Sequence, residues 1–241
     1  MEPVLVGCYN DLVVNRKVDF GFYLDNGEDG ILLPKRFAPS TLRIGDTLKV
    51  FVYHDSDNRL IATTQVANAS VGEIALLKAV AITGQGAFLD WGLMKDLFVP
   101  VSQQLSSMRL GGKYLVKLYL DKQTGRVAAT EKIDNQISND ILTVKEGEKV
   151  KLQVYRESDI GYVVIVNQVH QGLVYKNEVF THLHIGQMIE EGFVKKIRED
   201  NKLDIGIGKQ GVEKLDDDQV KLIQLLKLHK GFLPYHDKSS P

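Results

Sequence analysis

The sequence predicts a mainly β fold of three small closed barrels in tandem, followed by a short helical C-terminal segment. Two observations lead to this prediction. A spacing of glycines recurs three times along the 241 residues, and short runs of alternating polar and apolar side chains accompany it. Repetition at a fixed period indicates tandem units, and alternation with a period of two indicates β-strands.

The glycine spacing sets the number and the size of the units. In each unit two glycines lie 14 residues apart, and a third follows 24 or 25 residues later. These glycines are Gly7, Gly21 and Gly45, then Gly72, Gly86 and Gly111, then Gly147, Gly161 and Gly186. The expected units are residues 1–68, 69–138 and 139–210.

Each unit has room for five short strands. In the first two units the third glycine leads into an alternating run, at residues 45–53 and 112–120, and a turn and a second short run follow. Such paired runs are typical of β-hairpins. The third unit repeats the order with runs at 191–197 and 203–207.

Five strands in so small a unit leave two exposed edges unless the sheet closes. The OB-type Greek-key barrel is a five-stranded barrel of this kind. The second glycine of each unit lies inside an apolar run, where the lack of a side chain permits a β-bulge or a coiled strand. A single large β-sandwich would not need a glycine spacing that recurs three times, so the repeat argues against that fold.

The pattern changes after residue 211. Asp216 to Asp218 can cap a helix, the apolar residues between Val220 and Leu228 form one helical face, and Gly231 ends it. Ser239 to Pro241 resemble the first turn of another helix, at which the chain stops.

Composition limits the classes of function. Lys and Arg total 30 against 31 Asp and Glu, a net charge of -1, so binding to a polyanion requires a local basic patch. Cys8 is the single cysteine, and the N-terminal sequence lacks the pattern of a signal peptide. No stretch reaches the roughly 18 apolar residues of a membrane span. These features favour the cytoplasm and no membrane partner.

The order of glycines, strands and turns resembles the S1-type RNA-binding domain, an OB barrel, over residues 1 to about 210. Three such domains followed by a helical start resemble the bacterial conserved virulence factor B family, whose members end in a winged-helix domain. The resemblance implies RNA binding, a regulatory role in gene expression and no catalytic activity. It also implies that residues 211–241 are the incomplete start of a winged helix.

In S1-type domains the RNA face carries two aromatic residues around the glycine, a histidine, and an Asp and an Arg beside the last turn. The first two units match at Phe20, Tyr23, Asp55 and Arg59 and at Phe88, Asp121 and Arg126, but carry Pro34 and Pro100 in place of the histidine and Gln85 in place of one aromatic residue. The third unit has Ile160 and Val163 at the aromatic positions, with Tyr175, Asp200 and Lys202 still usable.

Aromatic rings next to cations suit unpaired nucleic acid, because a base stacked on a ring contributes about 1–3 kcal/mol and cations attract the phosphates. The RNA-binding candidates are Phe20, Tyr23, Lys35, Arg36, Arg59, Phe88, Lys117, Arg126, Tyr175, Lys176, Lys195, Lys196 and Lys202. Only residues 69–138 carry a net positive charge, with 8 basic and 6 acidic side chains.

A structural role competes with each of these assignments. Phe22, Phe98 and Phe193 are expected in the core, as is Tyr162, whereas Trp91 is placed near Lys95 as a second possible platform. A lysine on an alternating strand is usually part of a solvated face or protects a sheet edge.

Enzyme classes are disfavoured, since none of the common nucleotide, hydrolase or zinc motifs occurs. His182 and His184 would project to one side of a strand, but two ligands without a third indicate a surface pair rather than a metal site. The sequence therefore predicts no cofactor and no metal.

The favoured function is non-catalytic binding of single-stranded RNA across the tandem barrels, whose combined contacts raise the avidity. Two alternatives stay open: a DNA-binding regulator that acts through the winged helix, and a protein-interaction scaffold that uses exposed strand edges. The short junction at 67–71 predicts that the first two barrels are held together more firmly than the second and third.

Overall fold

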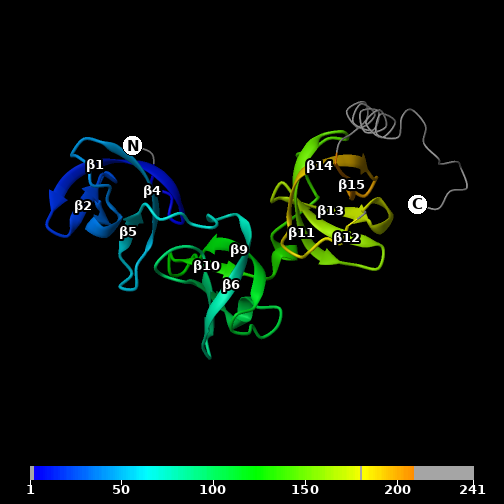
Figure 1. Ribbon diagram of the computed structural model, residues 1–241, viewed down its shortest axis with the longest axis horizontal. Coiled ribbons are helices and arrows are strands. Elements are labelled where there is room, and N and C mark those ends of the chain that lie inside the picture. Colours follow the sequence, from blue (N-terminus) through cyan, green and yellow to red (C-terminus); the bar gives the residue numbers. More distant parts are fainter. Residues whose placement is uncertain (1–2, 180, 209–241) are drawn as a thin grey trace, which may run out of the picture. The chain divides into compact units, whose positions relative to one another are not determined.

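The computed structural model describes residues 3–179 and 181–208, and over these residues the fold is mainly β. Three closed barrels, each of five strands, follow one another along the chain (Figure 1). This confirms the predicted fold class. The helix expected after Asp216 and the winged-helix start lie outside the described residues.

The strands are short and evenly divided among the barrels. The first barrel contains β1 (Cys8–Val18), β2 (Gly21–Leu24), β3 (Ile31–Pro34), β4 (Thr47–His54) and β5 (Leu60–Thr63). The second contains β6 (Ile74–Ile82), β7 (Gly86–Asp90), β8 (Leu97–Pro100), β9 (Lys113–Leu120) and β10 (Val127–Thr130). The third contains β11 (Lys149–Glu157), β12 (Gly161–Val166), β13 (His170–Tyr175), β14 (Met188–Ile197) and β15 (Leu203–Ile207).

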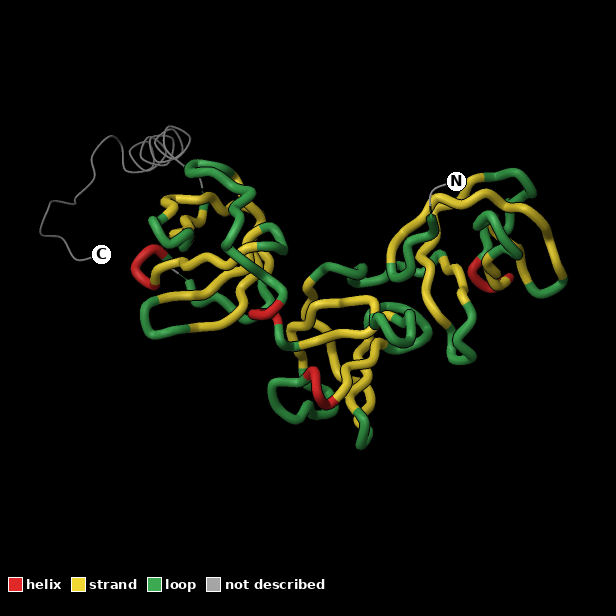
Figure 2. Tube along the Cα trace, turned by 180° about the vertical axis from the view of Figure 1, so that it is seen from behind, coloured by secondary structure: helices red, strands yellow, loops and turns green. Residues whose placement is uncertain are grey.

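Regular helix is confined to short 3-10 turns in the described residues (Figure 2). One follows the third strand of each barrel, and another follows β10; they are η1 (Lys35–Phe37), η2 (Val101–Gln103), η4 (Lys176–Glu178) and η3 (Ile133–Asn135). No helix in residues 3–179 and 181–208 has the length and apolar character needed to cross a membrane.

All three barrels share one strand order. In the first, the order β1-β2-β3-β5-β4 closes because β1 also pairs with β4. The β3–β5 pair is parallel and the other pairs are antiparallel. This arrangement is the five-stranded OB barrel that the repeat predicts.

The repeated second glycine is needed for close packing rather than for a bulge. Gly21, Gly86 and Gly161 open the second strand of each barrel, and a Cβ there would lie 2.1 to 2.3 Å from a carbonyl oxygen of the third strand. The register shifts lie in the preceding strands β1, β6 and β11 instead. The predicted bulge was therefore assigned to the wrong strand, whereas the requirement for glycine follows from backbone contact.

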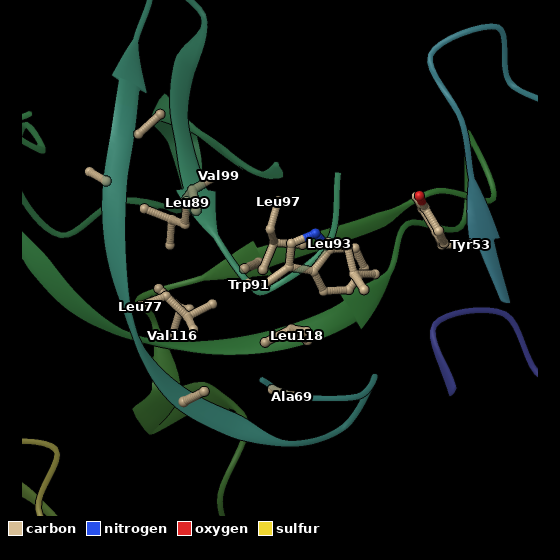
Figure 3. Packing of buried hydrophobic residues seen from close by; sticks show 14 of the residues in the cluster. Tyr53, Ala69, Leu77, Leu89, Trp91, Leu93, Leu97, Val99, Val116 and Leu118 are labelled. Atoms are coloured by element: carbon tan, nitrogen blue, oxygen red, sulfur yellow. The ribbon is translucent and has the colours of Figure 1, made fainter. Parts of the chain in front are cut away.

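The second half of strand β4 is buried on both faces. Val50 and Val52 point into the core of the first barrel, while Phe51 and Tyr53 belong to the core cluster of the second. The Phe51 and Trp91 ring centroids lie 5.5 Å apart in an edge-to-face arrangement. Figure 3 shows this cluster, with Tyr53 beside the group around Trp91. A single strand thus supplies apolar side chains to two barrels.

Hydrogen bonds reinforce this junction. The Val71 N–H donates to the Gly7 carbonyl at 2.8 Å, and the Ala67 N–H donates to the Tyr9 hydroxyl at 3.0 Å. The first two barrels therefore form one compact unit that ends at Ser138, and the third barrel lies in a second unit. The prediction of a firm first junction is confirmed.

The shared core makes the second barrel depend on the first. Phe51→Ala removes a fully buried ring, so we expect it to lower the unfolding free energy by about 3–5 kcal/mol. Trp91 is the single tryptophan of the chain and lies in the second barrel. Its fluorescence in a urea titration measures the effect there.

The matched control is Val13→Ala on the exposed face of β1, where the side chain is 44% exposed. This control is expected to leave the midpoint within the error of the measurement. An unchanged Trp91 midpoint in Phe51→Ala would contradict a shared core.

Candidate nucleic-acid interface

The same two positions form the centre of the outer face in every barrel. Two residues after the second glycine of each unit, a residue of the second strand pairs with one of the third strand; Tyr23 and Phe88 are half-buried there, and Val163 is buried. The pairs are Tyr23 with Leu32, Phe88 with Phe98, and Val163 with Leu173. Because bases stack on aromatic rings, the three faces differ in their capacity to bind bases.

The first barrel presents a pair of rings with a cation. Phe20 is 59% exposed, and its ring centroid lies 6.5 Å from that of the half-buried Tyr23. The Arg16 guanidinium lies 4.2 Å from the Tyr23 centroid. Arg16 was missed because the register shift that places it opposite Tyr23 has no clear signal in the sequence.

The predicted cations of the first barrel occupy two places. Lys35 and Arg36 are exposed in η1, with the Arg36 guanidinium 5.0 Å from the Phe37 ring centroid. Arg59 instead forms ion pairs with Asp55 at 2.8 Å and with Asp57 at 2.7 Å. Arg59 therefore offers a phosphate less attraction than Lys35 and Arg36 do.

Asp55 organises the β4–β5 turn. Its carboxylate accepts hydrogen bonds from the backbone N–H groups of Asp57 and Arg59, both at 2.9 Å, and from the Arg59 side chain. Burial acts to raise the pKa of Asp55, but these hydrogen bonds and the Arg59 charge outweigh it, so the pKa is lowered. The carboxylate stays charged and holds the turn.

The second barrel combines two aromatic rings with a cavity. The centroids of Phe88 and Phe98 lie 5.1 Å apart, and both half-buried rings line a cavity of about 360 Å³. The expectation that Phe98 belongs to the core is therefore wrong. Trp91 also lines the cavity but is only 2% exposed, so it is a wall rather than the free platform expected from the sequence.

Arg126 is the cation best placed for a ligand of this cavity. It lines the cavity, its Nε donates to Asn58 Oδ1 at 2.7 Å, and it forms no ion pair within the described part of the chain. Lys117 lies outside the cavity, where its amine donates to the Gln136 carbonyl at 2.9 Å. The two cations predicted in this unit are thus not brought together.

Five titratable side chains that line the cavity have perturbed pKa values, and burial is the first cause for His54, Lys95 and Asp96. Burial, followed by the positive charge of Arg126, lowers the pKa of Lys95. Burial, followed by the charges of Lys95 and Arg126, lowers the pKa of His54 and keeps it neutral at pH 7. Burial and the neighbouring Asp90 raise the pKa of Asp96.

Ion pairs engage three of the four lysines predicted to bind RNA in the third barrel, and Arg198 beside them. Lys176 pairs with Glu157 at 2.9 Å, Lys195 with Glu178 at 2.6 Å, Lys202 with Asp200 at 2.5 Å, and Arg198 with Asp204 at 2.9 Å. Lys196 is exposed on β14. This barrel combines an aliphatic centre with paired charges.

The aromatic side chains of the third barrel are likewise engaged. The Tyr175 hydroxyl donates to Asp204 at 3.3 Å and accepts a hydrogen bond from Arg198. Tyr162 is 5% exposed, as expected of a core residue, and its hydroxyl lies 3.0 Å from His182 Nδ1. His182 and His184 lie in a loop rather than on a strand.

Comparison with known proteins finds similarity to one domain family and to one solved structure. Residues 6–65 match the model of the S1 domain family. A solved structure of a multidomain protein with nucleic acid binding domains from Streptococcus pneumoniae covers 98% of this chain and 85% of that chain, at 21% identity and a TM-score of 0.48.

Two curated relatives extend the similarity over most of the chain. The uncharacterized protein YitL of Bacillus subtilis is 26% identical over 237 residues, which cover 95% of this chain and 79% of that protein. Conserved virulence factor B of Staphylococcus epidermidis is 25% identical over 224 residues, which cover 90% and 75%. The chain is therefore similar over most of its length to proteins named Conserved virulence factor B, and its first barrel matches the S1 domain.

Proposed function

We propose that the chain binds single-stranded RNA through its first two barrels and catalyses no reaction. The observation that carries the proposal is the Phe88–Phe98 ring pair, which lines a cavity together with Arg126, a cation that has no ion pair among residues 3–179 and 181–208. The match of residues 6–65 to the S1 domain supports nucleic-acid binding. A regulatory role in gene expression is part of the proposal and rests on the family resemblance.

The ring faces suit an unpaired strand. Phe20 and Tyr23 on the first barrel, and Phe88 and Phe98 on the second, offer ring surface that an unstacked base can cover. In duplex RNA the bases are stacked on one another and the major groove is too deep and narrow for side chains to read. Single-stranded RNA is therefore the expected ligand.

Four cations accompany these rings on the first two barrels. They are Arg16, Lys35, Arg36 and Arg126, and none forms an ion pair within the described residues. A local patch attracts phosphates although the net charge of the chain is -1. Because the two barrels form one unit, a strand bound to one ring face meets the second at high effective concentration.

The third barrel is expected to add little affinity. Releasing Lys176, Lys195 or Lys202 for a phosphate would break an ion pair. Its central pair, Val163 and Leu173, has no ring on which a base can stack. We therefore assign the contacts with the RNA strand to the first two barrels, residues 3–138.

The salt dependence of binding tests the proposal. The chain is titrated with labelled U12 RNA, with dT12 DNA and with a DNA duplex, each over a salt series. Four phosphate contacts give log K against log salt a slope of about −3, at about −0.7 for each contact. RNA is expected to bind more tightly than either DNA. Absence of salt-dependent RNA binding, or tighter duplex binding, would refute the proposal.

Single ring deletions test the stacking surfaces. Phe20→Ala and Phe88→Ala are each expected to lose about 1–3 kcal/mol of RNA affinity, roughly fivefold to 150-fold. Ile160→Ala is the matched control, because Ile160 occupies the position of Phe20 in the third barrel and is 61% exposed against 59%. Affinity is measured by fluorescence anisotropy, and thermal melting checks the fold.

Equal losses in Phe20→Ala and Ile160→Ala would contradict the assignment to the first two barrels. A fall in melting temperature that accounts for the whole loss would identify the ring as structural.

A further inference from the structure

The cavity on the second barrel has a wall from the first barrel. Tyr53 and His54, at the end of β4, line it together with Phe88 and Phe98. Its volume of about 360 Å³ lies within the range of about 300–1,000 Å³ typical of ligand pockets. The second barrel alone would leave this side of the cavity open.

Three contacts hold the wall in place. The Lys95 ammonium donates to the backbone carbonyls of His54 at 3.0 Å and Asp55 at 2.7 Å. The Arg126 Nε donates to the Asn58 side chain. Since the carboxylate of Asp55 fixes the turn from within, His54 is held at the cavity independently of any ligand.

His54 lines the cavity and also carries an unsatisfied polar atom. Its Nδ1 is buried and has no hydrogen-bond partner within the described residues. A buried polar atom without a partner destabilises the fold, so such atoms are rare and call for an explanation such as a functional role. A neutral imidazole has one donor and one acceptor nitrogen, which can pair with the polar edge of a nucleobase.

Arg126 completes the set of groups that a nucleotide needs. Its Nε faces Asn58, and the terminal nitrogens of the guanidinium are left for a phosphate. The rings of Phe88 and Phe98 supply the stacking surface. Ring, edge and phosphate contacts thus surround one cavity, and the edge contact comes from the other barrel.

We propose that this cavity is a composite pocket for one nucleotide of a single-stranded RNA, in which His54 of the first barrel reads the edge of a base stacked on the second. The inference rests on the proposed function and adds base preference to it. Base preference then depends on the junction, because neither barrel holds all the groups.

Trp91 provides a direct signal, since it is the chain's single tryptophan and lines the cavity. Its emission is followed while the full chain is titrated with U12, C12 and A12 RNA. The wild type is expected to prefer one of the three. His54→Ala should change the ratio of the highest to the lowest affinity about threefold to tenfold, the worth of one hydrogen bond.

Two further variants separate preference from affinity. Phe88→Ala should weaken binding of all three strands by a similar factor and preserve the ratio. His184→Ala, at an exposed histidine of the third barrel, should change neither. If His54→Ala lowers the melting temperature, His54→Gln keeps a donor and an acceptor in other positions and should still change the ratio.

The outcomes distinguish the two proposals. Anisotropy that shows no binding of any RNA refutes the proposed function. RNA binding with no base preference, no change in Trp91 emission, or a ratio unaltered within twofold by both His54 variants refutes the composite pocket alone. Equal affinity for free UMP and U12 would also refute it, because the pocket would then serve a mononucleotide.

Discussion

Burial of both faces of β4 is the constraint on which the structure of the first two barrels depends. Val50 and Val52 complete one core, and Phe51 and Tyr53 complete the next. A strand buried on both sides joins the barrels into one unit. The same strand ends at His54, so the packing that joins the barrels also places a polar side chain at the cavity.

The three barrels share one strand order and differ at a few positions of the second and third strands, on which the proposed difference in binding rests. The backbone plan and the glycines are constant, because Gly21, Gly86 and Gly161 allow the same close strand contact. The residue two places later is Tyr23, Phe88 or Val163. The proposal assigns nucleic acid to the first two barrels, whose rings lie near cations without an ion pair in the described residues, whereas ion pairs engage Lys176, Lys195 and Lys202 of the third.

Much of this was predictable from the sequence. The glycine period and the alternating runs predict the barrels, and the turn residues place the hairpins. Alternation indicates a strand at β4, however, and only its packing partner decides that Phe51 is buried as well as Val50 and Val52. Phe98 was expected in the core, because the sequence does not show that its side of the strand is left open as a cavity. Nor does the sequence show that Lys176 in η4 pairs with Glu157 of β11.

The account's central claim is that the joined pair of barrels forms the nucleic-acid-binding surface. Hydrogen-exchange mass spectrometry of the full chain, with and without saturating U12 RNA, tests it most directly. The account predicts added protection in β2–β3, in β7–β8 and in the turn between β4 and β5, with β12–β13 unchanged. Protection confined to the third barrel, or absent from the first two while RNA is bound, would contradict it.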